Sequence, residues 1–125
     1  MSNKQYIALF FDALERGAIE TIQSLIATGV KWEIVGLGAR SRDEVCANLE
    51  QTFATTDTRS AKLLSLIAEG DEVHALVASS FVYKNGKTLD NTLSLTYRFA
   101  ANQIIECTEF MDMDRVRAFF APPAA

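Results

Sequence analysis

Glu109 is the residue whose type and surroundings are best suited to chemistry. It lies in an alternating run, and strand parity places it on one face with Ile105, Cys107 and Met111. A carboxyl group among apolar side chains loses hydration, which raises its pKa. Such a group can take up or deliver a proton near neutral pH, so Glu109 is the candidate general acid or base. The alternative is a carboxyl that is hydrogen-bonded to a neighbour or reaches solvent and does no chemistry.

The single histidine and the two cysteines are the other residues that commonly act as nucleophiles, bases or metal ligands. Strand parity places His74 on the face opposite Cys107, too far away for a nucleophile and base pair. Cys46 and Cys107 lack metal-ligand spacing, and one histidine with scattered carboxylates falls short of a usual zinc site. We therefore expect no metal, no cofactor and two buried, reduced thiols in a cytoplasmic protein.

Three aromatic residues carry polar groups that could meet a ligand. Trp32 alternates with Lys31 and Glu33, so its indole faces inward, where its N–H could hold a ligand oxygen or its ring could pack in the core. Parity also places Tyr83 and Tyr97 on the inner face, where each hydroxyl could contact a ligand or tether the sheet.

The first half of the chain predicts three helices and one strand. The first helix runs from about Lys4 to Arg16 and ends before Gly17, with an apolar stripe at Ile7, Phe10, Phe11 and Leu14. The second carries Ile19, Ile22, Leu25 and Ile26 and is closed by Gly29. A strand spans Val30 to Val35, and Gly36 and Gly38 break it. Ser41 with Glu44 has the spacing of a capping box, so a third helix begins there, presents Val45, Cys46, Leu49 and Phe53 inward, and ends in the polar run 55–60.

The second half predicts an antiparallel sheet. Apolar or alternating runs cover Ala61 to Ala68, Val73 to Tyr83, Thr88 to Phe99 and Ile104 to Met111. Gly70-Asp71 and Ala101-Asn102 make turns, and Asn85-Gly86 predicts a two-residue type I′ turn. A short helix from about Asp112 to Phe120 follows, with Asp112 and Asp114 at its N-terminus, and Pro122-Pro123 ends regular structure.

Length and charge limit the classes of function. The 125 residues, 49% of them apolar, fit one domain spanning 1–125 with an ample core. A net charge of −4 without a basic run makes nucleic acid an unsuitable partner. No separate apolar signal region or bilayer-spanning run of ~20 residues is present, so we expect no membrane association.

Several local motifs, in this order along nearly the whole chain, resemble the SnoaL-like branch of the NTF2-like superfamily. They are Val30-Lys31-Trp32-Glu33, the helix start Arg40-Ser41-Arg42-Asp43-Glu44, Ala68-Glu69-Gly70-Asp71-Glu72-Val73, Tyr97-Arg98-Phe99 and Ile104-Ile105-Glu106. The resemblance implies an α+β cone, in which a strongly curved mixed or antiparallel sheet wraps three N-terminal helices and a short C-terminal helix follows. Its concave face lines a pocket, and its outer face usually forms a homodimer. Enzymes and non-catalytic binding modules share this fold, so the fold does not choose between them.

The family's site residues match this chain at one position. By resemblance, the ketosteroid isomerase base, tyrosine and protonated aspartate fall on Ile34, Phe10 and Leu95, all apolar. The Arg and Asp pair of limonene epoxide hydrolases has no counterpart around Ser79-Ser80-Phe81. Their Trp-x-Asp-Tyr-Phe-Asp stretch resembles 107–112, and SnoaL-type polyketide cyclases use one acidic residue at this place. The resemblance thus also points to Glu109.

Two classes of function follow from these residues. The first is acid–base catalysis by Glu109 on a small hydrophobic carbonyl compound, such as a polyketide-like metabolite. The expected ligand-binding residues are Phe10, Trp32, Ile34, Phe53, Leu95 and Tyr97. The second is a binding protein that holds a hydrophobic metabolite without turnover, or a dimeric interaction module with a vestigial pocket. We expect a homodimer through the outer face of the sheet, formed by His74, Leu76, Ala78, Ser80, Val82, Ser94, Thr96, Arg98, Ile104, Thr108 and Phe110.

Overall fold

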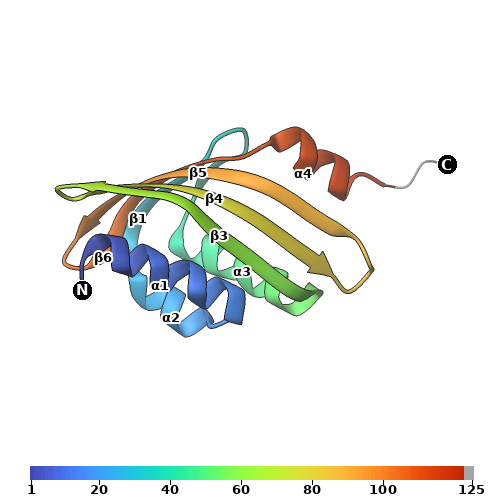
Figure 1. Cartoon of the computed structure of the whole chain (residues 1–125), viewed down its shortest axis with the longest axis horizontal. Helices are drawn as coiled ribbons and strands as arrows, with labels where there is room; N and C mark the ends of the chain where they lie inside the picture. Colours follow the sequence, from blue (N-terminus) through green and yellow to red (C-terminus); the bar gives the residue numbers. More distant parts are fainter. Residues whose placement is uncertain (123–125) are drawn as a thin grey trace.

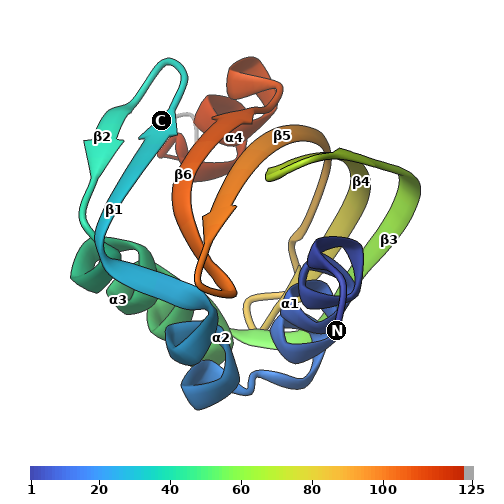
Figure 2. The same ribbon diagram turned by 90° about the vertical axis from the view of Figure 1, so that its left-hand side faces the viewer.

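The computed structural model describes residues 1–122, in which a curled sheet partly encloses a layer of helices (Figures 1 and 2). The sheet has six strands in the order β2-β1-β6-β5-β4-β3 within these residues. The strands are β1 (Ile26–Ile34), β2 (Gly38–Arg40), β3 (Thr56–Glu69), β4 (Glu72–Tyr83), β5 (Thr88–Ala100) and β6 (Gln103–Phe110). All neighbours are antiparallel except β1 and β6, which run parallel. The predicted α+β cone with a mixed sheet is confirmed.

Three helices precede the long strands and one follows them. They are α1 (Asn3–Arg16), α2 (Ile19–Leu25), α3 (Arg42–Thr55) and α4 (Met113–Phe120). The predicted capping box of Ser41 and Glu44 begins α3, and a second one, between Ser2 and Gln5, begins α1. Gly17 ends α1 with a positive φ of 71°, a conformation that favours glycine. Asp112 caps α4 by accepting from the backbone N–H groups of Asp114 and Arg115, so the predicted cap is confirmed.

The core lies between the concave face of the sheet and α1 and α2. Alternation along β4 buries Val73, Ala75 and Val77, while His74 and Leu76 are exposed on the convex face. The apolar stripe of α1 packs against this face, with Ile7 and Ala13 fully buried. Figure 2 shows the sheet as an arc around these helices, with α3 below β1 and β2. The side chains on the inner face of the sheet therefore decide what the interior offers a ligand.

Two strands begin earlier than predicted. Residues 26–29 were expected to finish the second helix, but Ile26 pairs with Ile104 and starts β1. The polar run 55–60 ends α3 as predicted, but the strand expected from Ala61 already starts at Thr56. Since β3 forms an edge of the sheet, one side of it meets water and tolerates polar residues. In both places strand pairing overrides the local sequence pattern. The short strand β2 was not predicted.

The predicted type I′ turn lies at a different hairpin. Gly86 has a φ of 87°, but Asn85 does not have a positive φ. The hydrogen bonds from Gly86 N to Tyr83 O and from Tyr83 N to Lys87 O instead fit a three-residue loop that ends on a left-handed glycine. At the β5–β6 hairpin, Ala101 and Asn102 both have positive φ, as a type I′ turn requires.

A bulge corrects the predicted facing of residues at the start of β6. Arg98 pairs with Glu106, but Phe99 pairs with Ile104, so Ile105 is an extra residue in the ladder. Ile104 is consequently 1% exposed in the core rather than on the outer face, and Ile105 does not share the regular inward alternation. Beyond the bulge, Cys107 and Glu109 face inward as predicted.

Other features of the described chain bear on the earlier expectations. Cys46 and Cys107 are buried free thiols, as predicted. Within residues 1–122 no helix combines the length and apolar character needed to cross a membrane. Pro122 is irregular, and Pro123 lies outside the described residues. The cytoplasmic location and the extent of the domain stay predictions.

Candidate active site

Glu109 lies on the inner face of the sheet between two apolar neighbours. Its cross-strand partners are Ile34 on β1 and Leu95 on β5. Trp32 Nε1 donates a hydrogen bond to Glu109 Oε1 at 3.1 Å, and no described protein group is bonded to Oε2. One carboxylate oxygen is thus fixed by the indole, and the other is left for a ligand.

Burial governs the acidity of this carboxyl. Loss of hydration raises the pKa of Glu109, and the hydrogen bond from Trp32 lowers it by a smaller amount. The side chain is nevertheless half-buried, because it borders a cavity. The arrangement gives a carboxyl that holds its proton to higher pH than an exposed glutamate and that a small molecule can reach.

Two further ionisable side chains lie beside Glu109. Tyr97 and Cys107 are cross-strand partners with 0% and 1% exposure. Burial raises the pKa of Tyr97 and of Cys107 well above the usual values, and the charge of Glu109 raises both further. The Tyr97 hydroxyl has no hydrogen-bond partner among the described residues. Both groups stay protonated at neutral pH, which leaves Glu109 as the candidate acid or base of this cluster.

The cavity beside Glu109 has a volume of about 540 Å³. Its walls come from α1, α3, α4 and the inner face of the sheet. The inner face of β5 contributes Leu95, Leu93, Asn91 and Leu89. Leu95 adjoins Glu109, and Leu89 lies about 20 Å away at the usual strand rise. The cavity is therefore elongated, with the carboxyl near one end.

Four of the six residues predicted to bind a ligand line this cavity together with Glu109. They are Phe10, Trp32, Ile34 and Leu95. The indole N–H of Trp32 is already donated to Glu109, so the predicted contact with a ligand oxygen is replaced by a contact with the carboxyl. Tyr83 also lines the cavity, as strand parity indicated.

Phe53 and Tyr97 do not border the cavity. The Arg59 guanidinium lies over the Phe53 ring, with 4.9 Å between the guanidinium carbon and the ring centroid. Arg59 is held there because it donates hydrogen bonds to the backbone carbonyls of Leu14 and Glu15. Tyr97 lies behind Trp32 in an edge-to-face contact with 6.3 Å between ring centroids. Both side chains support the site from outside its walls.

The cavity wall also contains polar and C-terminal residues that were not predicted from the sequence. Asn91 is 8% exposed and links β5 to the start of α4, because its side chain bonds to both the N–H and the carbonyl of Asp112. The Ser79 hydroxyl donates a hydrogen bond to the backbone carbonyl of Asn91. This linkage positions α4, which contributes Val116 and Phe120 to the wall. The position of Asn91 could have been predicted, because strand parity places it on the same face as Leu93 and Leu95. No sequence pattern predicted that α4 would contribute to the wall.

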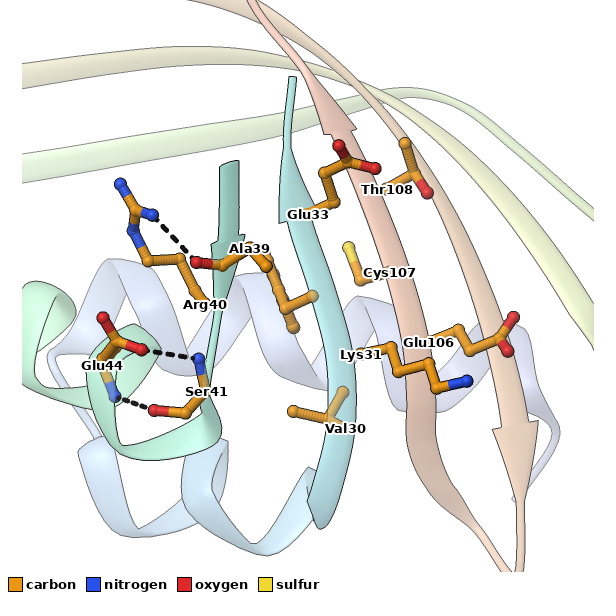
Figure 3. A pocket seen from close by; sticks show the side chains of 11 residues that line it. Val30, Lys31, Glu33, Ala39, Arg40, Ser41, Glu44, Glu106, Cys107 and Thr108 are labelled. Carbon is orange, nitrogen blue, oxygen red and sulfur yellow. Dashed lines mark hydrogen bonds between the residues drawn. The ribbon is translucent and has the colours of Figure 1, made fainter. Parts of the chain in front are cut away.

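A second hollow of about 610 Å³ lies against β1, β2, β6 and the start of α3 (Figure 3). It is bordered by charged side chains, among them Lys31, Glu33 and Glu106. Lys31 and Glu33 are exposed and alternate with the inward-facing Trp32. This hollow lacks a buried reactive group other than the Cys107 thiol, whose pKa is raised by burial. Among residues 1–122, no three potential ligands from His, Cys, Asp and Glu are close enough together to hold a metal ion.

Solved structures similar to this one span several activities. IdmH of Streptomyces antibioticus, a proposed polyketide cyclase, is 18% identical with a TM-score of 0.81 over 94% of this chain and 97% of that chain. AclR of Streptomyces galilaeus, a proposed hydroxylase, is 14% identical with a TM-score of 0.82 over 94% and 93%. An LEH-like epoxide hydrolase from M. tuberculosis is 13% identical with a TM-score of 0.79 over 90% and 84%. At such identities the likeness concerns the fold.

The sequence itself settles the family. The profile of the family described as SnoaL-like domain matches residues 7–107, which run from within α1 to within β6. The match includes Trp32 and the inner face of the long strands. The chain therefore belongs to the SnoaL-like domain family.

Proposed function

We propose that this protein binds a small hydrophobic carbonyl compound in the cavity and that Glu109 transfers a proton to or from it. The observation that carries the proposal is the placement of the Glu109 carboxyl: Trp32 holds one oxygen, Ile34 and Leu95 flank the side chain, and the cavity borders it. Burial raises the pKa of Glu109, so its proton affinity suits exchange with a weak carbon acid better than that of an exposed glutamate.

The dimensions and lining of the cavity support a small apolar ligand. A volume of about 540 Å³ lies within the range of roughly 300–1,000 Å³ typical of small-molecule sites. Aromatic rings from Phe10, Trp32 and Phe81 line it together with leucine side chains. Flat ring systems pack well against such walls. The similar structures described as a proposed polyketide cyclase and as an LEH-like epoxide hydrolase carry the names of small-molecule enzymes, which supports the same ligand class here.

Non-catalytic binding is the second candidate function. It is favoured because the indole N–H of Trp32 is already donated to the Glu109 carboxyl and because Phe10, Ile34 and Leu95 are apolar. A carbonyl oxygen that gains negative charge beside Glu109 would then receive no hydrogen bond from these four side chains. The two candidates differ in turnover and agree in ligand class.

Proton exchange at a ketone separates the two candidates without knowledge of the natural substrate. The probe is 2-acetonaphthone in D2O, with loss of its α-proton signal followed by NMR. Catalysis predicts faster exchange with the wild-type protein and at least a roughly hundredfold loss in Glu109→Gln, with ketone affinity retained. Binding without turnover predicts equal affinity and no acceleration in either protein. A wild-type protein that fails to bind apolar ketones would contradict both candidates.

We also propose a homodimer through the convex face of the sheet. Leu76 and Phe110 are 38% and 50% exposed on that face, and burying them in a two-fold contact would be favourable. Analytical ultracentrifugation should give a dimer for the wild-type protein and a monomer for Leu76→Asp. Val35→Asp, at an exposed position in the β1–β2 loop, is the matched control and should stay dimeric. A monomeric wild-type protein would contradict this proposal.

A further inference from the structure

Arg40 is a cation of the cavity wall that lacks a carboxylate partner. It pairs across the strands with Trp32, so its side chain starts from the same face of the sheet, and it borders both the Glu109 cavity and the second hollow of Figure 3. It is half-buried. Within residues 1–122, Arg40 forms no ion pair, whereas Arg16, Arg98, Arg115 and Arg117 each do. A partly desolvated guanidinium without a bonded carboxylate favours binding of an anion.

The guanidinium is held in place by the protein backbone. Nη1 donates to the carbonyl of Leu37 at 3.2 Å and to that of Ala39 at 2.9 Å. Figure 3 shows the side chain bent back toward Ala39. Nε and Nη2 have no acceptor among the described residues. These two nitrogens form one edge of the guanidinium, and that edge can bind a carboxylate through two parallel hydrogen bonds.

Glu44 is the acidic neighbour that could compete for this edge. Its carboxylate instead accepts a hydrogen bond from Ser41 N at 3.0 Å in the capping box of α3, as Figure 3 shows. The bonds with Ser41 lower the pKa of Glu44, with a smaller contribution from the charge of Arg40. Glu44 is exposed and forms no ion pair with Arg40, so the guanidinium edge stays available.

Arg40 and Glu109 are placed to act on one ligand. Ile34 on β1 pairs with Gly38 on β2 and with Glu109 on β6, so the two outer strands lie about 10 Å apart. Arg40 is two residues along β2 from Gly38, on the same face as Glu109. An elongated ligand that spans roughly 10 Å can therefore touch both side chains.

We propose that Arg40 binds the carboxylate of an otherwise apolar ligand whose body lies in the cavity beside Glu109. This inference rests on the proposed function, because it assigns a chemical class to the ligand of the same site. The net charge of the chain is −4 and repels anions at long range. A local cation is then needed for an organic acid to be preferred over its neutral analogue.

The test compares a carboxylate with a neutral ligand of the same shape. The probes are 2-naphthoate and 2-acetonaphthone, with affinities measured by calorimetry at pH 8. The wild-type protein should bind the naphthoate about tenfold or more tightly than the ketone. Arg40→Gln should remove this preference and change the ketone affinity by less than about twofold. Arg16→Gln, which removes an equal charge from an exposed pair on α1, should keep the preference.

The other outcomes contradict either the role of Arg40 or the proposed function as a whole. If the wild-type protein binds both probes equally, or if Arg40→Gln weakens both equally, Arg40 is not the anion site, and the Glu109 cavity still stands. If the wild-type protein binds neither probe, the proposed function fails together with this inference. Glu109→Gln should keep the naphthoate preference, since that preference depends on the guanidinium.

Discussion

The indole of Trp32 and the carboxyl of Glu109 are joined by a hydrogen bond of 3.1 Å between two parallel strands, β1 and β6. The residues are 77 positions apart in the sequence, so the bond also ties the first strand to the last. The N–H donor lowers the pKa that burial has raised. One contact therefore sets both the direction of the carboxyl and its proton affinity.

Trp32→Phe should raise the pKa of Glu109 further, because it removes the donor that stabilises the charged form and keeps an aromatic ring. A 13C NMR titration of the Glu109 side-chain carboxyl checks this. A shift to lower pH would contradict the role given to the indole. Phe10→Leu is the control, because it removes a ring whose centroid lies 6.2 Å from that of Trp32 but leaves the hydrogen bond between Trp32 and Glu109 in place.

Glu109 should make the protein less stable as pH rises. The folded-state pKa lies above the unfolded value near 4.3, so between the two the folded state binds more protons, and raising the pH lowers the free energy of unfolding. The contribution is fully present below the unfolded pKa and lost as pH rises through the folded pKa. Each unit of difference amounts to about 1.4 kcal/mol.

Urea unfolding of wild-type and Glu109→Gln proteins between pH 4 and 8 measures this effect. The Gln variant should gain stability relative to the wild type as pH rises and then reach a plateau. A difference that does not vary with pH would mean that Glu109 titrates as it does in the unfolded chain.

Asn91→Ala should destabilise the protein by about 1–3 kcal/mol, because two partly buried hydrogen bonds to the backbone of Asp112 are lost. α4 should loosen at the same time, which amide hydrogen exchange in Met113–Phe120 would detect. Thr92→Ala, at the exposed neighbouring position, is the control and should change stability by less than about 0.5 kcal/mol. Unchanged exchange in α4 would contradict the linking role of Asn91.

Ala101→Gly should stabilise the protein by about 0.5–1 kcal/mol. Ala101 has a φ of 49° in the β5–β6 turn, a conformation that strains an L-residue and that glycine adopts freely. Thermal unfolding measures the gain. Ala100→Gly, one position earlier in β5, should instead be destabilising, and a loss of stability in both variants would show that Ala101 is not strained.

The sequence predicted what depends on local periodicity and missed what depends on pairing. Alternation placed Glu109, Trp32 and Leu95 on the inner face, and capping spacing located the start of α3. The bulge at Ile105 could not be predicted, because an extra residue in a ladder is defined only by the partner strand. For the same reason Ile26 was assigned to a helix rather than to β1.

The site residues also differ in whether local sequence or the folded chain determines their position. Phe53 has helical periodicity typical of an inward residue, yet its ring packs under the Arg59 guanidinium from β3 and does not border the cavity. The sequence around Arg40 did not predict a ligand-binding role. That role depends on the absence of an ion-pair partner among the described residues and on the hydrogen bonds of its guanidinium to the backbone carbonyls of Leu37 and Ala39. Such properties belong to the folded chain rather than to a segment of sequence.

The most direct test of the central claim compares two titrations of the same protein. One follows the ionisation of Glu109 by 13C NMR, and the other follows the rate of α-proton exchange of 2-acetonaphthone against pH at low ketone concentration. If Glu109 is the base, the rate rises with pH, levels off, and has its midpoint at the pKa measured by NMR. A rate that follows hydroxide concentration without a midpoint, and that is the same in Glu109→Gln, would contradict the account.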